Sequence, residues 1–149
     1  MSGLSIEYFS FDKKRIIDSR HYRYIIPFLS VFTPGFIMAQ LKFCFYVPQS
    51  HLEQVKEAVF AAGCGNIGAY SKCCWQIKGQ GQFIAAESTN PFVGRVSELT
   101  QIEEFKVETV CDEKNIINVL AEFHQSHPYE EPAYEIFPML TAKDFNNEL

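Results

Sequence analysis

The chain has 149 residues, of which 47% are hydrophobic and 15% are aromatic, so it can bury one sizeable core and a single domain is expected. The formal net charge of −5 argues against a nucleic-acid-binding surface, which needs a basic stripe to displace the counterions of the phosphates. The five cysteines are odd in number and form no Cys-x-x-Cys pair. This pattern excludes a disulfide framework and favours reduced thiols in a cytoplasmic protein.

The segment 1–37 stands apart from the rest of the chain. It contains a basic stretch followed by an apolar run at 24–32, which superficially resembles a secretory signal. Pro27 interrupts this run, which is also too short to span a membrane, so no membrane association is expected. We expect 1–37 to be a poorly structured extension, with Met38 as a candidate start of translation, and 38–149 to be the folded domain.

The first regular pattern is an alternation of apolar and other residues over 41–47, which is typical of a half-buried strand. Apolar residues then recur at helical spacing up to position 62, which predicts an amphipathic helix. Ser50 and Glu53 have the spacing of a capping box at the start of this helix. Gly63 is expected to end the helix as a left-handed cap.

A glycine-rich stretch at 63–70 follows the helix. Phosphate cradles usually lie between a strand and the N-terminus of a helix, and this stretch has the opposite order, so nucleotide binding is not favoured. Its glycines permit positive φ and close approach of the backbone. Because binding residues concentrate on loops, the candidate ligand-binding residues here are Gly65, Asn66, Gly68 and Tyr70.

Two short strands are expected next, at 73–77 and 82–86. Gly79 and Gly81 lie between them and mark a bulge or a hairpin bend. The large apolar residues of the two strands are predicted to enter the core, namely Trp75, Ile77 and Phe83. The stretch 90–94 has turn chemistry, and a new alternation at 105–111 predicts a further strand.

Asp112 is placed to cap a second helix. An apolar stripe from Ile116 to Phe123 supports this helix, and an alternation over 134–138 predicts a last strand. The order strand, helix, strand, strand, helix, strand predicts an α+β fold, the ferredoxin-like βαββαβ sandwich with two helices on one face of a mainly antiparallel sheet. The other face of such a sheet has no helix, and with this many aromatic residues on short strands it is expected to need a partner, so we expect a homo-oligomer.

The segment 127–134, with the sequence His-Pro-Tyr-Glu-Glu-Pro-Ala-Tyr, joins the second helix to the last strand. Its two prolines predict a stiff, extended loop. Its imidazole, phenol and carboxylates suit a metal, a cationic or polar ligand, or a neighbouring subunit, while the alternative is a rigid connector. The candidate site residues are therefore Gly79, Gly81 and Tyr129 for a ligand, and His127, Glu130 and Glu131 for a divalent metal ion.

Six short motifs occur in one order along the chain, at 65–70, 74–75, 79–83, 90–94, 103–104 and 127–134. Together they resemble the domain that is inserted in the NGG-interacting factor three family, and in particular its short stand-alone bacterial form, across nearly all of 41–140. The resemblance implies a PII-like and CutA-like ferredoxin fold. It also implies assembly as a trimer.

In the full-length family, a separate domain whose halves flank the insert carries a two-metal site, and some members are named as homologues of a GTP cyclohydrolase. The resemblance covers the insert alone, so this metal chemistry is not carried over. We expect a non-catalytic, oligomeric regulatory module that binds a small ligand or a metal. The alternative is a protein-interaction or assembly partner of a separate metal-binding, hydrolase-like protein. An enzyme is disfavoured because no nucleophile, base and orienting group share a recognisable spacing.

Overall fold

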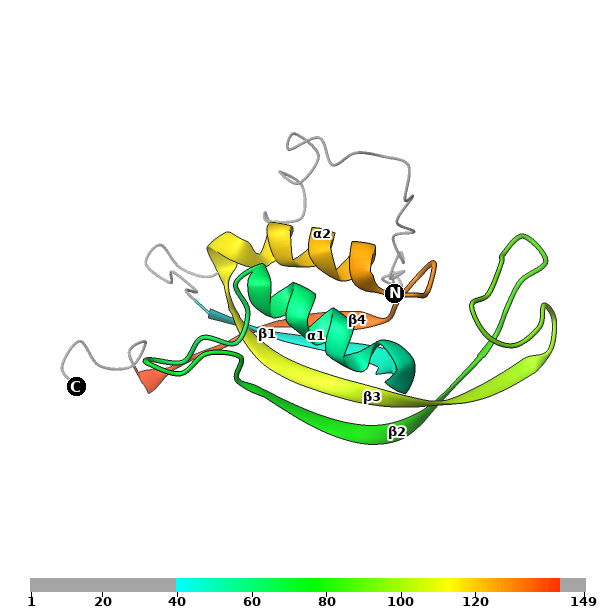
Figure 1. Ribbon diagram of the computed structural model, residues 1–149, viewed down its shortest axis with the longest axis horizontal. Coiled ribbons are helices and arrows are strands. Elements are labelled where there is room, and N and C mark those ends of the chain that lie inside the picture. Colours follow the sequence, from blue (N-terminus) through cyan, green and yellow to red (C-terminus); the bar gives the residue numbers. More distant parts are fainter. Residues whose placement is uncertain (1–39, 143–149) are drawn as a thin grey trace, which may run out of the picture. The chain divides into compact units, whose positions relative to one another are not determined.

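The computed structural model describes residues 40–142 of the chain (Figure 1). The extension expected at 1–37 lies outside the described residues. The elements follow the predicted order, and a single 3-10 turn precedes each helix. They are β1 (Gln40–Pro48), α1 (Leu52–Ala61), β2 (Cys74–Ile84), β3 (Leu99–Asp112), α2 (Ile116–Ser126) and β4 (Tyr134–Pro138). Within this described part, no helix is long and apolar enough to cross a membrane.

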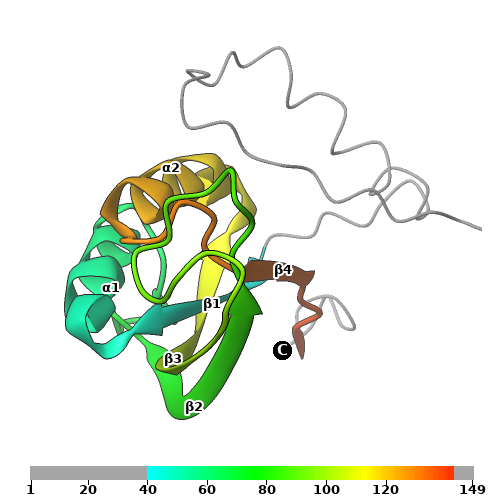
Figure 2. The ribbon, with the colours of Figure 1, turned by 90° about the vertical axis from the view of Figure 1, so that its right-hand side faces the viewer.

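The four strands form one sheet in the order β2-β3-β1-β4, and every neighbouring pair is antiparallel. Both helices cover the same face of this sheet, which leaves the opposite face without a helix (Figures 1 and 2). The predicted ferredoxin-like arrangement is therefore confirmed. The two central strands, β3 and β1, carry the buried positions beneath the helices.

The core is built around aromatic residues of β1 and α2. Phe43 and Phe45 are fully buried, and each ring centroid lies 5.4 Å from that of Phe123 on α2. The Phe43 and Phe123 rings meet edge to face, an arrangement that adds to the gain from burial. Val55 and Val59 of α1 complete the same cluster. The alternation of β1 and the apolar stripe of α2 thus meet as their patterns predicted.

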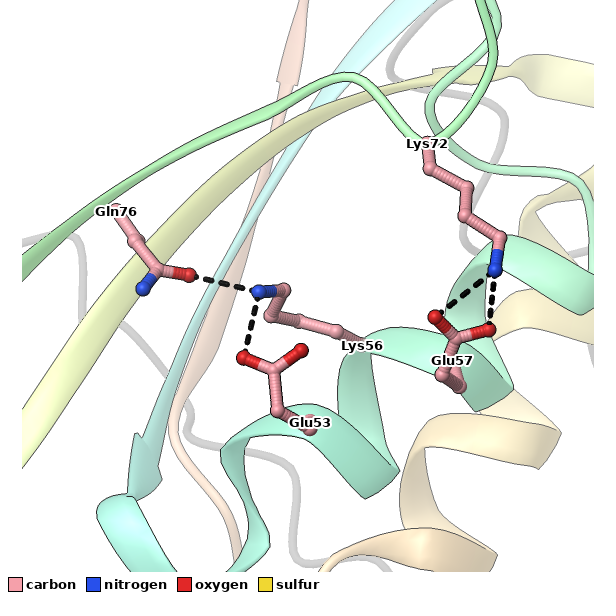
Figure 3. Close-up of polar contacts among 5 residues, drawn as sticks. All are labelled: Glu53, Lys56, Glu57, Lys72 and Gln76. Carbon is pink, nitrogen blue, oxygen red and sulfur yellow. Dashed lines mark hydrogen bonds and ion pairs between the residues drawn. The ribbon is translucent and has the colours of Figure 1, made fainter.

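The predicted helix N-caps are wrong. The N-cap of α1 is His51, which makes no side-chain cap hydrogen bond, and the Ser50 hydroxyl lies 2.9 Å from the His51 imidazole instead. Glu53 pairs with Lys56 at 2.9 Å, so its carboxylate does not turn back to the helix start (Figure 3). Asp112 likewise makes no side-chain cap bond, because a 3-10 turn separates it from α2.

The C-terminus of α1 ends as predicted. Gly63 has a φ of +116°, and its N–H donates to the Phe60 carbonyl at 3.0 Å. The next N–H, of Cys64, donates to the Val59 carbonyl at 3.1 Å. These two bonds are the pair that closes a Schellman motif, and only glycine adopts the required φ at little cost.

Polar side chains fasten the outer surface of α1 to β2 and to the loop before it (Figure 3). Lys56 donates to Gln76 of β2 at 3.0 Å, and Lys72 forms an ion pair with Glu57 at 2.6 Å. The Lys72 and Glu57 side chains are both more than half exposed. Such exposed pairs stabilise a fold by less than about 1 kcal/mol.

The expected break in β2 does not occur. Gly79 and Gly81 pair in register with Glu104 and Ile102, so β2 is one continuous strand and the hairpin turn lies beyond it, at 85–98. The prediction of a core position for Trp75 is also wrong, since 58% of this side chain is exposed. The same holds for Ile77 at 50% exposure. Both lie on the face of the sheet that no helix covers.

Candidate functional site

A cavity of about 430 Å³ lies at one end of the sheet, between the β2–β3 hairpin and the loop that joins α2 to β4. Residues of β1, of β2 and the turn after it, of β3 and of the loop between α2 and β4 line it. The lining residues are Tyr46, Gly81, Gln82, Phe83, Ala85, Thr89, Pro91, Phe92, Val93, Glu104, Tyr129, Glu130, Glu131 and Ala133. A cavity of this size accepts a small organic molecule.

His127 fixes the loop that forms one wall. It is buried at the C-cap of α2, and its Nε2 lies 2.9 Å from the Tyr46 carbonyl oxygen. The backbone N–H of Tyr129 donates to Nδ1 at 3.1 Å. Because Nδ1 accepts a hydrogen bond and the partner of Nε2 is a carbonyl, the imidazole is neutral with its proton on Nε2. The imidazole therefore ties the loop to β1.

Tyr129 forms the inner end of the cavity. Burial, and then the neighbouring Glu104 carboxylate, raise the pKa of the Tyr129 phenol. The phenol is thus protonated at neutral pH and acts as a donor. Gly81 stands beside this pair, and a Cβ atom at position 81 would overlap the Glu104 carboxylate. The predicted site glycine is therefore needed for space rather than for a positive φ.

The hairpin turn forms the opposite wall. The backbone N–H of Asn90 donates to Oε2 of Glu130 at 3.1 Å, which links two loops that are 40 positions apart. The Phe92 ring centroid lies 6.1 Å from that of Tyr129 and 5.4 Å from that of His51. Figure 2 shows the 85–98 loop, in green, passing over the orange 127–133 loop. The sequence indicated only a turn at this position.

The cavity carries negative charge. The carboxylates of Glu104, Glu130 and Glu131 lie among aromatic walls. Among the ion pairs of residues 40–142, none joins a lysine or arginine to Glu104 or Glu130. Carboxylates beside aromatic faces attract a cation by both charge and the ring quadrupole.

The structure brings together part of the predicted ligand site. Gly81 and Tyr129 line the cavity, together with the two carboxylates of the loop that contains Tyr129. Gly79 lies two positions before Gly81 in β2, outside the lining. The 65–70 stretch lies at the opposite end of the protomer, beyond the C-terminus of α1 (Figure 1). The other candidate ligand residues, Gly65, Asn66, Gly68 and Tyr70, are thus remote from the cavity within one chain.

Two of the predicted metal donors at 127–131 already make hydrogen bonds to backbone groups in this structure. Both nitrogens of His127 are held by backbone groups, so the imidazole would have to break a hydrogen bond to coordinate a metal. Among residues 40–142, no group of three or more His, Cys, Asp or Glu side chains is placed to hold a metal ion. His127 instead braces the loop, and a metal at His127, Glu130 and Glu131 stays a prediction.

Relatives of known sequence match one segment of their own length. No family model matches the chain. The chain is 42% identical over 111 residues to a GTP cyclohydrolase 1 type 2 homolog of Halalkalibacterium halodurans, a match that covers 74% of this chain and 30% of that protein. The proteins of the same name from Mycobacterium tuberculosis and Bacillus subtilis are 42% and 40% identical over 26% and 29% of their lengths. The chain therefore spans less than a third of each relative.

Solved structures give the same result for the fold. A Bacillus cereus protein related to NIF3 superposes with a TM-score of 0.60 at 32% identity, covering 72% of this chain and 27% of that one. CutA1 from Shewanella sp. SIB1 has a TM-score of 0.51 at 14% identity, covering 70% of this chain and 84% of CutA1, which shows a shared fold alone. Over its ferredoxin-like domain, the chain is thus related to a segment of the NIF3-type GTP cyclohydrolase 1 type 2 homologues.

Proposed function

We propose that the ferredoxin-like domain is a non-catalytic binding module whose cavity takes a small, positively charged organic ligand. The observation that carries this proposal is the composition of the cavity, which combines four aromatic rings with three carboxylates. The rings are those of Tyr46, Phe83, Phe92 and Tyr129. A ligand of this kind has a flat apolar body and a charged donor group, such as an amidine or a guanidine.

The polar groups of the cavity can accept hydrogen bonds from the charged donor of such a ligand. Glu130 accepts a hydrogen bond from the Asn90 amide, and the Glu104 carboxylate neighbours the Tyr129 phenol. Each carboxylate has a second oxygen that can accept from a charged donor, and charge-assisted hydrogen bonds are about twice as strong as neutral ones. A phosphate or carboxylate ligand would meet repulsion from the same groups. The cavity therefore selects against nucleotides.

Benzamidine and benzoate form a matched pair of probes for this proposal, because they share a shape and differ in the sign of their charge. Isothermal titration calorimetry of the full chain is expected to detect benzamidine and not benzoate. Glu104→Gln is expected to weaken benzamidine binding by about tenfold or more, which corresponds to one charge-assisted contact. Binding of both probes with equal affinity would contradict the proposal.

Glu103→Gln is the control for net charge. Glu103 precedes Glu104 in β3, but it pairs with Lys78 at 2.9 Å and does not line the cavity. Both substitutions remove one negative charge from the same strand. An equal loss of affinity in the two variants would mean that the probe responds to overall charge and not to the cavity.

We also propose that the domain acts as a homo-oligomer, with a trimer favoured by the resemblance stated above. Support comes from the face of the sheet without helices, on which Trp75 and Ile77 are at least half exposed. Large apolar side chains on such a face typically mark an interaction surface. Sedimentation of the wild-type chain beside Trp75→Ser tests this part, and a monomeric wild type would exclude it.

The same surface supports a second candidate function, which is docking onto a separate metal-binding, hydrolase-like protein. This candidate rests on Trp75 and Ile77 alone and does not need the cavity. Co-purification of such a protein with the wild-type chain, and its loss in Trp75→Ser but not in Glu104→Gln, would favour docking over ligand binding.

A further inference from the structure

Cys64 and Cys111 face each other at the end of the sheet remote from the cavity. An isolated antiparallel bridge pairs them, where the chain leaves α1 and runs beside the end of β3. The N–H of Gly65 donates to the Val110 carbonyl at 2.8 Å, so the hydrogen bond flanks the cysteine pair instead of joining it. In such a non-hydrogen-bonded pair, the Cα atoms lie about 4.5 Å apart and the side chains are close. This separation lies within the range that a disulfide spans.

The two thiols contact each other in the core. Their exposed fractions are 1% for Cys64 and 2% for Cys111. The Cys111 thiol lies 3.3 Å from the Asp112 carbonyl oxygen. The neighbouring Cys64 thiol lowers the pKa of Cys111, whereas the Cys111 thiol and burial raise the pKa of Cys64. Cys111 is therefore the thiol that loses its proton first.

We propose that Cys64 and Cys111 are a redox site, which hydrogen peroxide converts from two thiols into an intramolecular disulfide. The Cys111 thiolate attacks one peroxide oxygen, the O–O bond breaks, and the leaving hydroxide takes up a proton to become water. Cys64 then attacks the sulfur of the Cys111 sulfenic acid, the S–O bond breaks, and the second water leaves. Two thiols thus lose two electrons and two protons, and one peroxide becomes two waters.

The other thiols are poorly placed for the same reaction. Cys73 and Cys74 are adjacent in sequence, so their side chains point in different directions and cannot readily pair with each other. Cys44 is buried on the opposite face of the sheet from the core cluster, in the strand position paired with Glu108 and Glu135. Cys44 therefore serves as a buried control thiol.

The disulfide would fix the base of the glycine-rich loop, which the cavity does not use. Within this loop, Ile67 and Tyr70 exchange two backbone hydrogen bonds of 3.0 Å and form a small exposed turn. Just after the loop, the exposed ion pair between Lys72 and Glu57 links the chain to α1 (Figure 3). A covalent link at Cys64 would hold the turn where exposed polar contacts hold it weakly. Oxidation is therefore expected to rigidify the 65–70 stretch.

Peptide mapping of the full chain tests the proposal directly. The wild type is treated with hydrogen peroxide, free thiols are alkylated, and the protein is digested without a reductant. The expected product joins the peptides of Cys64 and Cys111 with a mass lower by two hydrogens, and dithiothreitol reverses it. A Cys64 link to Cys73, or irreversible sulfinic acids at both cysteines without any link, would overturn the proposal.

Melting curves provide a second readout. Oxidation of the wild type is expected to raise the midpoint on the order of 10 °C, because the link closes a long loop in the unfolded chain. The rise should persist in Cys44→Ala and disappear in Cys64→Ala. Slower amide exchange at Ile67 and Tyr70 after oxidation would locate the effect. A rise of equal size in Cys64→Ala would refute the assignment, and the peptide map does not depend on whether that variant folds.

Discussion

Gly79 and Gly81 offer a paired substitution that tests how the cavity is built. Both lie in β2, two positions apart, and neither has a positive φ. A Cβ atom at position 79 meets nothing within 4 Å, whereas one at position 81 overlaps the carboxylate of Glu104. Gly79→Ala is therefore expected to stabilise the fold by about 0.5 kcal/mol, through the reduced entropy of the unfolded chain.

Gly81→Ala is expected to act in the opposite direction. The Glu104 carboxylate must move away, which costs about 1 kcal/mol in rotamer energy. The buried Tyr129 phenol then loses its interaction with a charged neighbour, which costs roughly a further 1.5 kcal/mol. Because both variants share the entropic gain of alanine, Gly81→Ala should be less stable than Gly79→Ala by about 2.5 kcal/mol.

Urea unfolding of the two variants at neutral pH measures this difference. A Glu104→Ala background provides the control, because without the carboxylate Gly81→Ala should behave like Gly79→Ala. The same variants are expected to differ in ligand affinity, with benzamidine binding lost in Gly81→Ala and kept in Gly79→Ala. Equal urea midpoints for Gly79→Ala and Gly81→Ala in the wild-type background would refute the contact between position 81 and Glu104.

Three further outcomes follow from the described contacts. The pKa of Tyr129 is raised in the native state, so the unfolded chain releases the phenolic proton first and native stability falls as pH rises above about 10. Tyr129→Phe removes this proton and should therefore reduce the loss of stability at alkaline pH. Urea midpoints measured across that range check this, and identical pH profiles would count against it. His127→Ala should cost about 2–3 kcal/mol by leaving two backbone groups unpaired, with partial rescue by His127→Gln, whose amide both donates and accepts. Gly63→Ala should cost more than Gly68→Ala in thermal unfolding, because the φ of +116° at position 63 is more strained for alanine than the φ of +57° at position 68, and only the Cβ at position 63 would meet Asn115, at 2.6 Å; equal costs would contradict this reasoning.

The parts of the fold that the sequence predicted well are those whose buried face lies on a single element. Phe43 and Phe45 alternate with polar positions in β1, and the stripe of α2 follows helical spacing, so each pattern states which side is covered. Trp75 and Ile77 show the limit of this reasoning. Their alternation in β2 is as regular, but the helices cover only one face of the sheet, and no local pattern tells which face that is.

The sequence predicted only one wall of the candidate site, for a related reason. The two prolines of the loop after α2 predicted a stiff loop, and Tyr129 and Glu130 of this loop line the cavity. The opposing wall at Asn90 and Phe92 was interpreted as an ordinary turn, since a contact across 40 positions leaves no periodic signal. A metal at His127 was predicted from an imidazole close to two carboxylates and stays a prediction; in the fold, both nitrogens of His127 contact backbone groups.

The first and last strands lie side by side, which affects how such a domain can be inserted in other proteins. β1 and β4 are antiparallel neighbours, and the N–H of Met139 donates to the Gln40 carbonyl at 3.1 Å, so the domain begins and ends at one point in space. A host protein that receives it in a surface loop needs to close only a short gap, and the entropy of loop closure grows slowly with the length added. A fold of this kind can therefore be inserted in a surface loop of a longer chain with little change to the host domain. This agrees with relatives in which the matching segment is 26–30% of the length.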